Sequence, residues 1–189
     1  MVPHYSDFKD RISSVEGLLF PGEDEFLFNM SAQMPEDGVI VEMGSYLGKS
    51  SVSLGFPCLG TKRKVYCIDL WGTESWFTSW KETINKFGLS ENVIPLRGYA
   101  GDILRDWEKL TGGVKINMVF NDTSHCLPSV LNEFILVYPW VKNEGIIAFH
   151  DFTHNSYPDV ARTWEVVKTM LLNHKSMGSI VLGRKVEIK

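Results

Sequence analysis

The sequence has little of what marks several large classes of protein. Its three cysteines, Cys58, Cys67 and Cys126, show no metal-binding or redox spacing, which is typical of a reduced, cytosolic protein. The formal net charge is −4, so no positive excess favours nucleic acid or an anionic membrane. No apolar run approaches about 18 residues, and the first residues lack a signal-peptide pattern. We therefore expect a soluble, cytoplasmic protein that binds neither nucleic acid nor a membrane.

Repeats, low-complexity tracts and linkers are also absent, and 189 residues with 44% hydrophobic side chains suffice for one packed domain, 1–189. Short apolar runs alternate with segments of helical spacing. The strand-like runs are 38–43, 64–70, 92–98, 116–122 and 145–151. The helical segments are 48–57, 76–87, 101–109, 127–139 and 158–173.

Continuous apolar strands separated by helices indicate a parallel sheet that is covered on both faces. We predict an α/β fold with a Rossmann-like, doubly wound, mostly parallel sheet of seven strands. The last two strands should form an antiparallel hairpin within 178–189 that turns at Gly183–Arg184. Residues 1–36 should form a helical cap, with one helix after Ser6 and another after Gly22.

The stretch "VIVEMGSYLGKSS" (39–51) is almost a phosphate-binding P-loop, but only three residues separate Gly44 from Gly48. Glu42 ends the preceding strand, and its carboxylate would repel the phosphates that a P-loop attracts. The same carboxylate suits S-adenosylmethionine (SAM), which carries an ammonium and a sulfonium and no phosphate. Asp69 ends the second strand, where an acidic group can accept hydrogen bonds from both ribose hydroxyls. The pattern therefore favours SAM over a nucleoside triphosphate.

Five segments, in order, resemble class I SAM-dependent methyltransferases. "VEMGSYLGKSSVSL" is similar to their first motif, in a form common among small-molecule O-methyltransferases, and "YCIDLW" and "PLRGYAGDILRDW" are similar to the second and third. "INMVFNDTSH" followed by "NEGIIAFHDF" resembles a subgroup related to sugar and macrolide O-methyltransferases. The resemblance runs from about Gly38 to Val167 and implies a SAM-dependent enzyme.

The resemblance also implies where the cofactor lies. Glu42 and Gly44 would hold the methionine part and Asp69 the ribose, while Trp71 would either lie against adenine or fill the loop at the sheet edge. Tyr99 and Ala100 would line the adenine edge. The full set implied for the cofactor is Glu42, Gly44, Ser45, Gly48, Ser50, Asp69, Leu70, Trp71, Tyr99, Ala100 and Asp122.

The residues expected to remove the proton of the methyl acceptor lie at the ends of the fourth and fifth strands. Asp122 and His125 form a D-x-x-H motif, and His150–Asp151 closes the fifth strand. A hydroxyl that attacks a sulfonium methyl must lose its proton, and an ordinary alcohol needs a base or a Lewis acid to do so at neutral pH. We predict that His125 is the general base, with Asp122 and Asp151 orienting the hydroxyl directly or through a divalent cation such as Mg²⁺.

In metal-dependent relatives, the Asp of D-x-x-H and an acidic pair after the fifth strand bind the metal. Here His150 stands in place of the first acid of that pair, so the candidate metal ligands are Asp122, His150 and Asp151. Imidazole suits transition metals better than magnesium. His150 alternatively forms hydrogen bonds behind the sheet, so the sequence leaves a metal-free site open.

The methyl acceptor is not identified by the sequence. The N-terminal helices and the segments 70–80 and 152–159 should shape its site, and Trp76, Phe77 and Trp80 either contact it or pack in the core. The expected function is SAM-dependent methylation of a hydroxyl on a small molecule or sugar. The alternatives are a non-catalytic SAM-fold binding protein and an NAD(P)-dependent oxidoreductase, which the missing G-x-G-x-x-G disfavours. A monomer and a homodimer are both compatible with the sequence.

Overall fold

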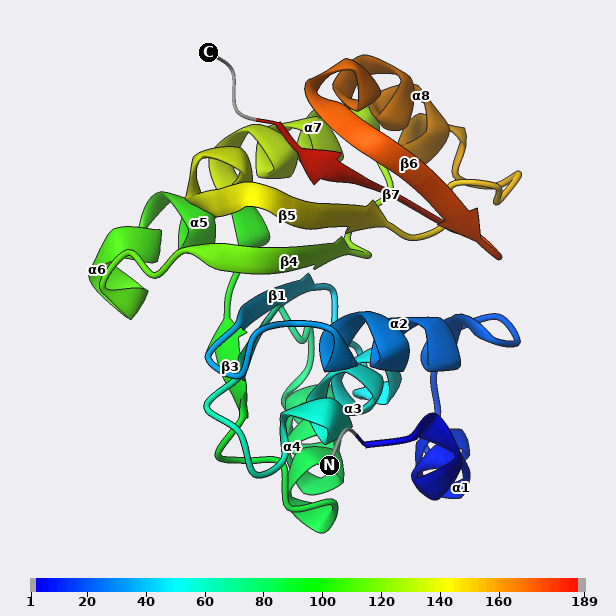
Figure 1. Ribbon diagram of the computed structural model, residues 1–189, viewed down its shortest axis with the longest axis vertical. Coiled ribbons are helices and arrows are strands. Elements are labelled where there is room, and N and C mark those ends of the chain that lie inside the picture. Colours follow the sequence, from blue (N-terminus) through cyan, green and yellow to red (C-terminus); the bar gives the residue numbers. More distant parts are fainter. Residues whose placement is uncertain (1–2, 187–189) are drawn as a thin grey trace.

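The computed structural model describes residues 3–186 and contains a seven-stranded sheet with helices on both faces (Figure 1). Across the sheet the order is β3-β2-β1-β4-β5-β7-β6. Neighbours among β1 to β5 are parallel, whereas β7 runs antiparallel between β5 and β6. The predicted fold class is confirmed. The strands are β1 Val39–Met43, β2 Lys64–Asp69, β3 Val93–Arg97, β4 Ile116–Asn121, β5 Val141–Phe149, β6 Leu171–Met177 and β7 Ile180–Lys185.

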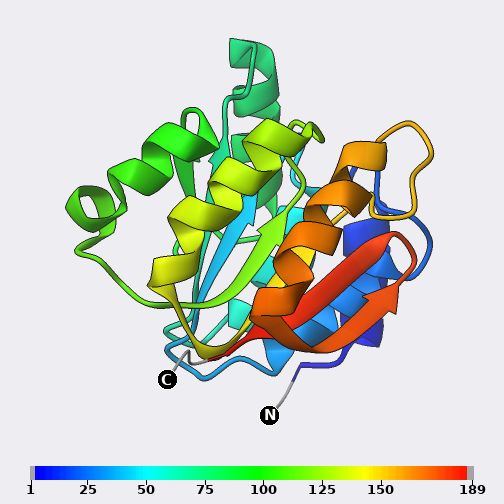
Figure 2. The same ribbon diagram turned by 90° about the horizontal axis from the view of Figure 1, so that it is seen from above.

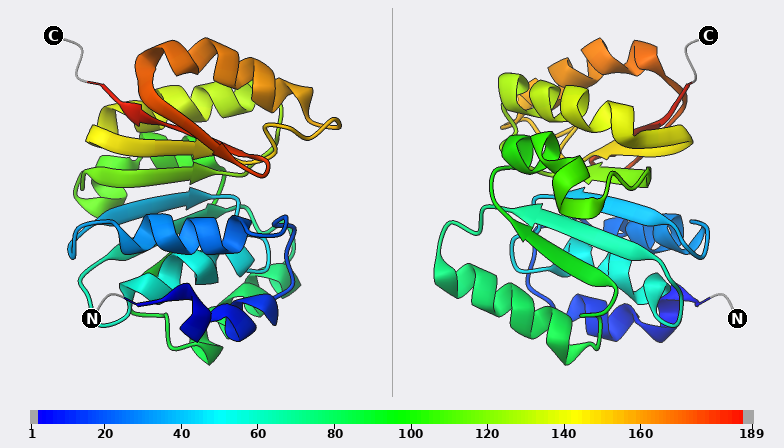
Figure 3. Two further views of the ribbon diagram at one scale, coloured as in Figure 1. Left: turned by 45° about the vertical axis from the view of Figure 1, so that its right-hand side comes forward. Right: turned by 90° about the vertical axis from the view of Figure 1, so that its left-hand side faces the viewer.

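Two layers of helices cover the two faces of this sheet. One layer consists of α1 Lys9–Ser13, α2 Glu23–Ala32, α3 Lys49–Gly55 and α4 Glu74–Lys86. The other consists of α5 Ala100–Arg105, α6 Trp107–Thr111, α7 Leu127–Val137 and α8 Pro158–Val167. Figure 2 shows α5, α7 and α8 side by side on one side of the sheet, and the left view of Figure 3 shows α2 beside α3 on the other.

Consecutive residues of the inner strands pack against opposite helical layers. In β1, Ile40 packs in the cluster of α1 to α4 and Val41 in the cluster of α5 to α8, as the two-residue period of a strand requires. Strand order reverses between β1, which is followed by α3 on one side, and β4, which is followed by α7 on the other. In open α/β sheets a crevice forms at such a switch point, beyond the carboxyl ends of the strands.

The terminal hairpin lies earlier in the chain than the sequence predicted. Its turn is at Gly178–Ser179 between β6 and β7, not at Gly183–Arg184, and α8 ends at Val167 instead of continuing to residue 173. Gly178 has φ +59°, which favours glycine, whereas Gly183 lies within β7, where a Cβ would come within 2.7 Å of Leu171 Cβ. Strand β6 was missed because all its residues after Leu171 are exposed, so it shows no apolar alternation. Strand β5 likewise begins at Val141, before the apolar run that predicted it.

The N-terminal helices pack onto α3 and the start of the sheet. Helix α2 begins directly after Gly22, and its Leu27 and Phe28 are fully buried. Helix α1 begins at Lys9, after a short 3₁₀ turn, and buries Ile12. No helix within residues 3–186 is long and apolar enough to span a bilayer.

Trp107 tests the packing of the second helical layer. Its side chain is fully buried, and its Nε1 donates a hydrogen bond to the Val114 carbonyl oxygen at 3.0 Å. The substitution Trp107→Ala should lower the free energy of unfolding by about 3–5 kcal/mol, measured by urea denaturation followed by circular dichroism. Trp76 is 45% exposed, so Trp76→Ala should cost less than about 1 kcal/mol. Equal losses for the two variants would contradict this packing.

Candidate active site

Two cavities meet beyond the carboxyl ends of β1, β2 and β4. The larger has a volume of about 560 Å³ and the smaller about 220 Å³. Gly44, Asp69 and Asp122 line both, so together the cavities form one crevice with a shared middle. The larger cavity extends between α5 and α7, and the smaller extends towards Leu18 and Leu19 in front of α2.

Gly44 allows the turn after β1 to lie directly against the end of β4 in this crevice. It has φ +87°, and a Cβ at this position would lie only 1.9 Å from the Asp122 carbonyl oxygen. The backbones are also tied together, because Asp122 N donates to Met43 O at 2.7 Å and Gly44 N to Ile68 O at 2.8 Å. Only glycine therefore fits where the turn after β1 crosses the end of β4.

Glu42 lies beneath the turn instead of facing the crevice. Its side chain is completely buried, lines neither cavity and accepts hydrogen bonds from Ser45 Oγ and Ser51 Oγ. Burial raises the pKa of its carboxyl, although hydrogen bonds from serines oppose the shift. The structure does not support the expected direct contact with the methionine part of SAM, because β1 points Glu42 towards the α3 layer. The side chain instead organises the turn.

Asp69 connects the turn to the end of β2 and faces both cavities. Its Oδ2 accepts hydrogen bonds from the backbone nitrogens of Ser45 and Tyr46 at 2.8 and 2.9 Å. Its Oδ1 accepts one from Trp71 N at 2.6 Å. Of the remaining turn residues expected to contact the cofactor, Ser45 and Ser50 line the smaller cavity, whereas Gly48, with φ +101°, lines neither and begins α3.

Trp71 fills the loop at the sheet edge, the second of the two roles considered for it. The indole is 1% exposed, packs against Phe77 and Trp80 with ring centroids 4.8 and 5.0 Å away, and lines neither cavity. Its Nε1 donates to Tyr46 O at 2.9 Å, which further supports the glycine turn. An adenine contact by Trp71 is therefore not supported, whereas the other three expected adenine contacts, Leu70, Tyr99 and Ala100, do line the larger cavity.

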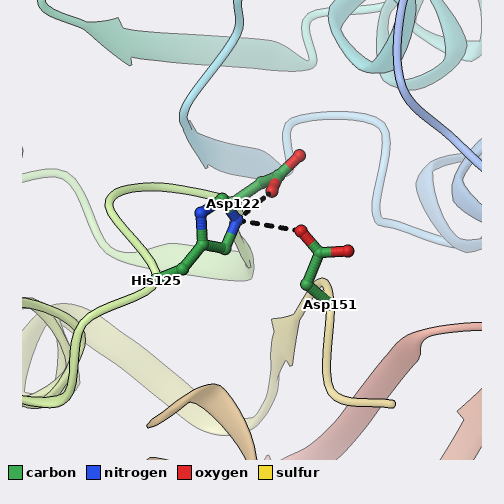
Figure 4. Close-up of side chains that lie close together, drawn as sticks. All are labelled: Asp122, His125 and Asp151. Atoms are coloured by element: carbon green, nitrogen blue, oxygen red, sulfur yellow. Dashed lines mark hydrogen bonds and ion pairs between the residues drawn. The ribbon is translucent and has the colours of Figure 1, made fainter. Parts of the chain in front are cut away.

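Asp122, His125 and Asp151 come together at the ends of β4 and β5 (Figure 4). Asp122 lines both cavities and His125 the smaller one, whereas Asp151 lines neither. His125 Nε2 lies 3.2 Å from Asp122 Oδ1 and 3.0 Å from Asp151 Oδ2. The imidazole also stacks on Tyr157, with ring centroids 4.2 Å apart. His125 and Asp151 adopt φ +56° and +59°, and such left-handed backbone in non-glycine residues concentrates at functional sites.

His150 joins this cluster from behind and binds a residue that the sequence did not single out. The ring is 2% exposed, with Nδ1 3.2 Å from Asp122 Oδ1 and Nε2 2.9 Å from Glu23 Oε2. Glu23, the first residue of α2, is completely buried, and its Oε1 accepts hydrogen bonds from Ser179 N and Oγ at 2.6 and 2.8 Å. The sequence does not mark Glu23 as part of the site, because His150 and Ser179 lie 127 and 156 residues further along the chain.

The carboxylates control the charge of both histidines. Burial alone would lower the pKa of each imidazole, but hydrogen bonds to Asp122 and Asp151, and for His150 also to Glu23, raise the pKa of His125 to about 9 and that of His150 to about 12. Burial opposes ionisation of Asp122 and Asp151, yet hydrogen bonds from the histidines hold the pKa of both carboxyls below the usual range. Near pH 7 the cluster thus sets two imidazolium charges against the three carboxylates of Glu23, Asp122 and Asp151.

The donor atoms also fit a divalent cation. One ligand atom from each of Asp122, His125 and Asp151 lies within 4.8 Å of the others. Two carboxylate oxygens and one imidazole nitrogen form a donor set that a divalent ion accepts. His150, the third ligand suggested by the sequence, is less suited, because Glu23 and Asp122 hold its two nitrogens and its ring is buried. The geometry thus favours His125 over His150 in such a set.

Comparison with known proteins shows the family to which the chain belongs. A protein family described as a methyltransferase domain matches residues 41–152, which is more than half of the chain. The chain belongs to this methyltransferase family. The match covers the glycine turn, the D-x-x-H motif and Asp151, and confirms the resemblance to methyltransferases.

Solved methyltransferases share the fold at low sequence identity. An O-methyltransferase from Bacillus cereus, solved with SAH, superposes with a TM-score of 0.73 at 15% identity, covering 98% of this chain and 93% of that one. TomG from Streptomyces achromogenes, an O-methyltransferase involved in tomaymycin synthesis and solved with SAM, gives 0.72 at 16% identity, covering 97% of both chains. CalS11, a TDP-rhamnose 3'-O-methyltransferase of calicheamicin biosynthesis, gives 0.71 at 14% identity, covering 95% and 80%.

The raised pKa of His125 predicts how stability depends on pH. A histidine whose folded-state pKa is about 9, against an ordinary value of 6.5, contributes stability in full below pH 6.5 and loses it as the pH rises through 9. Across this window, in EDTA, the free energy of unfolding should fall less steeply in His125→Gln than in the wild type, by about 1.4 kcal/mol per pH unit. Urea denaturation at a series of pH values measures both slopes. His4 is exposed, so His4→Gln should keep the wild-type slope; the same slope in His125→Gln would show that His125 is not charged by its neighbours.

Proposed function

We propose that this protein transfers the methyl group of SAM to a hydroxyl of a small molecule, such as a sugar or a glycosylated metabolite. The observation that carries the proposal is the position of the Asp122–His125–Asp151 cluster at the crevice, where Asp122 lines both cavities, His125 lines the smaller one and Asp151 contacts His125. An elongated cofactor in this crevice has its middle, not its end, beside the cluster. Membership of the methyltransferase family supports the reaction, and the SAM and SAH complexes of the structural neighbours support the cofactor.

The crevice fits the chemical parts of SAM in a definite order. The larger cavity has room for the adenosine, with Asp69 available to the ribose and Leu70, Tyr99 and Ala100 on the adenine side. The smaller cavity offers Ser45, Ser50 and Lys49, whose ammonium complements the methionine carboxylate. Gly44 leaves the passage between them open, since a Cβ there would meet Asp122. When bound, SAM supplies a methyl group on a positively charged sulfur.

His125 is the proposed base for the acceptor hydroxyl. Its Nε2 faces Asp122 and Asp151 and is therefore the atom that takes the proton of a hydroxyl held between those carboxylates. The free enzyme holds this imidazole protonated near pH 7, because its pKa is about 9. A positive charge brought into the crevice lowers that pKa and frees Nε2, so the carboxylates and the incoming charge together decide when His125 acts as a base.

A divalent cation is the alternative source of that positive charge. Asp122 and Asp151 would hold it, with His125 as third ligand, and it would acidify a hydroxyl bound to it. We also propose a cytoplasmic location, supported by three cysteines that are all free in the structure.

Asp69 provides the test of the cofactor. Asp69→Ala should weaken SAM binding by about 1.5–3 kcal/mol, because a charged acceptor for ribose is lost and the amides of the glycine turn lose their partner. Isothermal titration calorimetry measures the affinity, with NADH and ATP as ligands that should not bind the wild type. Asp102 also lines the larger cavity but is ion-paired with Arg105, so Asp102→Ala serves as the matched control. Unchanged SAM affinity in Asp69→Ala would remove Asp69 from the site.

His125 provides the test of proton transfer. His125→Ala should lower kcat on a responsive hydroxylated acceptor by about 10²–10⁴, while the dissociation constant for SAM stays nearly unchanged. His4→Ala, at an exposed position, should leave both constants at the wild-type values. Full activity in His125→Ala would refute the base assignment and turn attention to His150 or to His154, whose ring stacks on Tyr157 beside His125.

Chelation separates the two sources of positive charge. If the cation is essential and exchangeable, dialysis against EDTA should abolish turnover, and adding back a divalent metal should restore it. Turnover that survives EDTA would refute the metal-dependent version and leave His125 with the two carboxylates alone.

A further inference from the structure

The larger cavity contains a buried acidic side chain that the proposed reaction does not use. Glu133 lies on the inner face of α7, beside the buried Val130, Phe134 and Val137, and is 6% exposed. Burial raises the pKa of its carboxyl, so this position is costly for an acid. An apolar residue would serve the packing of α7 better, which suggests that the carboxyl serves a ligand.

One oxygen of Glu133 is held by the two residues that flank Asp122. Its Oε2 accepts hydrogen bonds from Asn121 Nδ2 at 2.9 Å and from Thr123 Oγ1 at 2.6 Å. Asn121 is the last residue of β4, and its own side chain is 4% exposed. The carboxyl is thus fixed in orientation by hydrogen bonds from the end of β4 and the residue after Asp122.

The other oxygen of Glu133 has no protein partner and faces the cavity. No hydrogen bond reaches Oε1 from residues 3–186, and among these residues Glu42 Oε1 is the only fully enclosed side-chain oxygen or nitrogen without a partner. Glu133 Oε1 is therefore accessible, and the space that Glu133 lines is the larger cavity. A buried side chain whose one free oxygen opens into a cavity is arranged to receive a hydrogen bond from a ligand.

The other carboxylates of the larger cavity are already engaged. Asp69 accepts three backbone hydrogen bonds and is the proposed ribose partner. Asp102 is paired with Arg105 at 2.7 Å, and Asp122 contacts His125 and His150. Among these carboxylates, Glu133 therefore remains available to the base, which is the other polar part of an adenosine.

We propose that Glu133 Oε1 accepts a hydrogen bond from the exocyclic 6-amino group of adenine and so selects adenosyl cofactors. The inference rests on the proposed SAM-binding function of this crevice. It adds a specificity-determining residue on α7, across the cavity from Tyr99 and Ala100 at the start of α5. Because Asn121 and Thr123 both donate to Oε2, the amide oxygen of a glutamine at this position would take the place of Oε2. Its NH₂ group would then point into the cavity, where a second donor repels the 6-amino group.

The experiment compares SAH with the analogue in which hydrogen replaces the 6-amino group. Calorimetry should show that the wild type binds SAH about tenfold or more tightly than this analogue, as expected for a hydrogen bond to a buried carboxyl oxygen. In Glu133→Gln the dissociation constant for the analogue divided by that for SAH should fall from about ten to about one or below. The ratio is measured within one protein, so a partly misfolded fraction cancels. Asp102→Asn, which makes the same change on the same cavity, should keep the wild-type ratio.

The outcomes distinguish this inference from the proposed function. If the wild type binds neither SAH nor the analogue, the proposed function itself fails. If it binds both equally, or if Glu133→Gln discriminates as strongly as the wild type, SAM binding stands and the assignment of Glu133 is overturned. Should Glu133→Gln fail to fold, the wild-type ratio still decides, since a ratio near one rules out any recognition of the 6-amino group.

Discussion

The close contact between the turn after β1 and the end of β4 is the constraint on which the site depends. Gly44 lies against the Asp122 carbonyl with no room for a side chain. This contact brings three strand ends to one point, so that Gly44, Asp69 and Asp122 line both cavities. The tight turn is supported from below by Glu42 and from the side by Asp69 and Trp71. Some residues that the sequence suggests as ligand contacts, such as Glu42 and Trp71, thus support the turn instead of lining the crevice.

A second constraint is the gathering of five ionisable groups in one cluster, of which Glu23, His150 and Asp151 are buried and Asp122 and His125 are half-buried. Burying Glu23, Asp122 and Asp151 together would be prohibitive without the two histidines, whose pKa values are raised so that they stay charged. His150 is the structural member, since both its nitrogens are held by carboxylates and its ring is 2% exposed. His125 is 22% exposed at the side chain and borders the smaller cavity. The cluster therefore has a fixed part around His150 and a part around His125 that a ligand can reach.

The fold and the outline of the site were predictable because they follow from local patterns. Apolar runs ending in Glu42, Asp69, Asp122 and Asp151 defined four strand ends that parallel topology must bring to one edge. Partners distant in the chain were not predictable. Glu23 reaches His150 across 127 residues, and Glu133 turns towards the cavity only because Asn121 and Thr123 hold it. The direction of a side chain at a strand end was equally hidden, which is why Glu42 was expected in the crevice but is packed behind it, and why the sequence left two roles open for Trp71.

The prediction of β6 was wrong for a different reason, and the actual position of this strand bears on the site. An exposed edge strand has no apolar period, so only a turn glycine marks it, and the sequence offers both Gly178 and Gly183. The actual turn places Ser179 where its N–H and hydroxyl both bind Glu23, and a side chain on Gly178 would come within 2.5 Å of Glu23 Oε1. The hairpin thus fixes the carboxylate that in turn fixes His150.

The proton on His125 and a divalent cation compete for the same place. Each would neutralise Asp122 and Asp151, and the imidazole nitrogen that contacts both carboxylates is the one that a cation would need as a ligand. Cation binding must then release the proton, so its apparent affinity rises with pH up to the pKa of His125, about 9. If the cation takes Nε2, His125 ceases to be available as a base. The two mechanisms are therefore alternative occupancies of one site, and the charge that enters the crevice determines which of them the same three side chains perform.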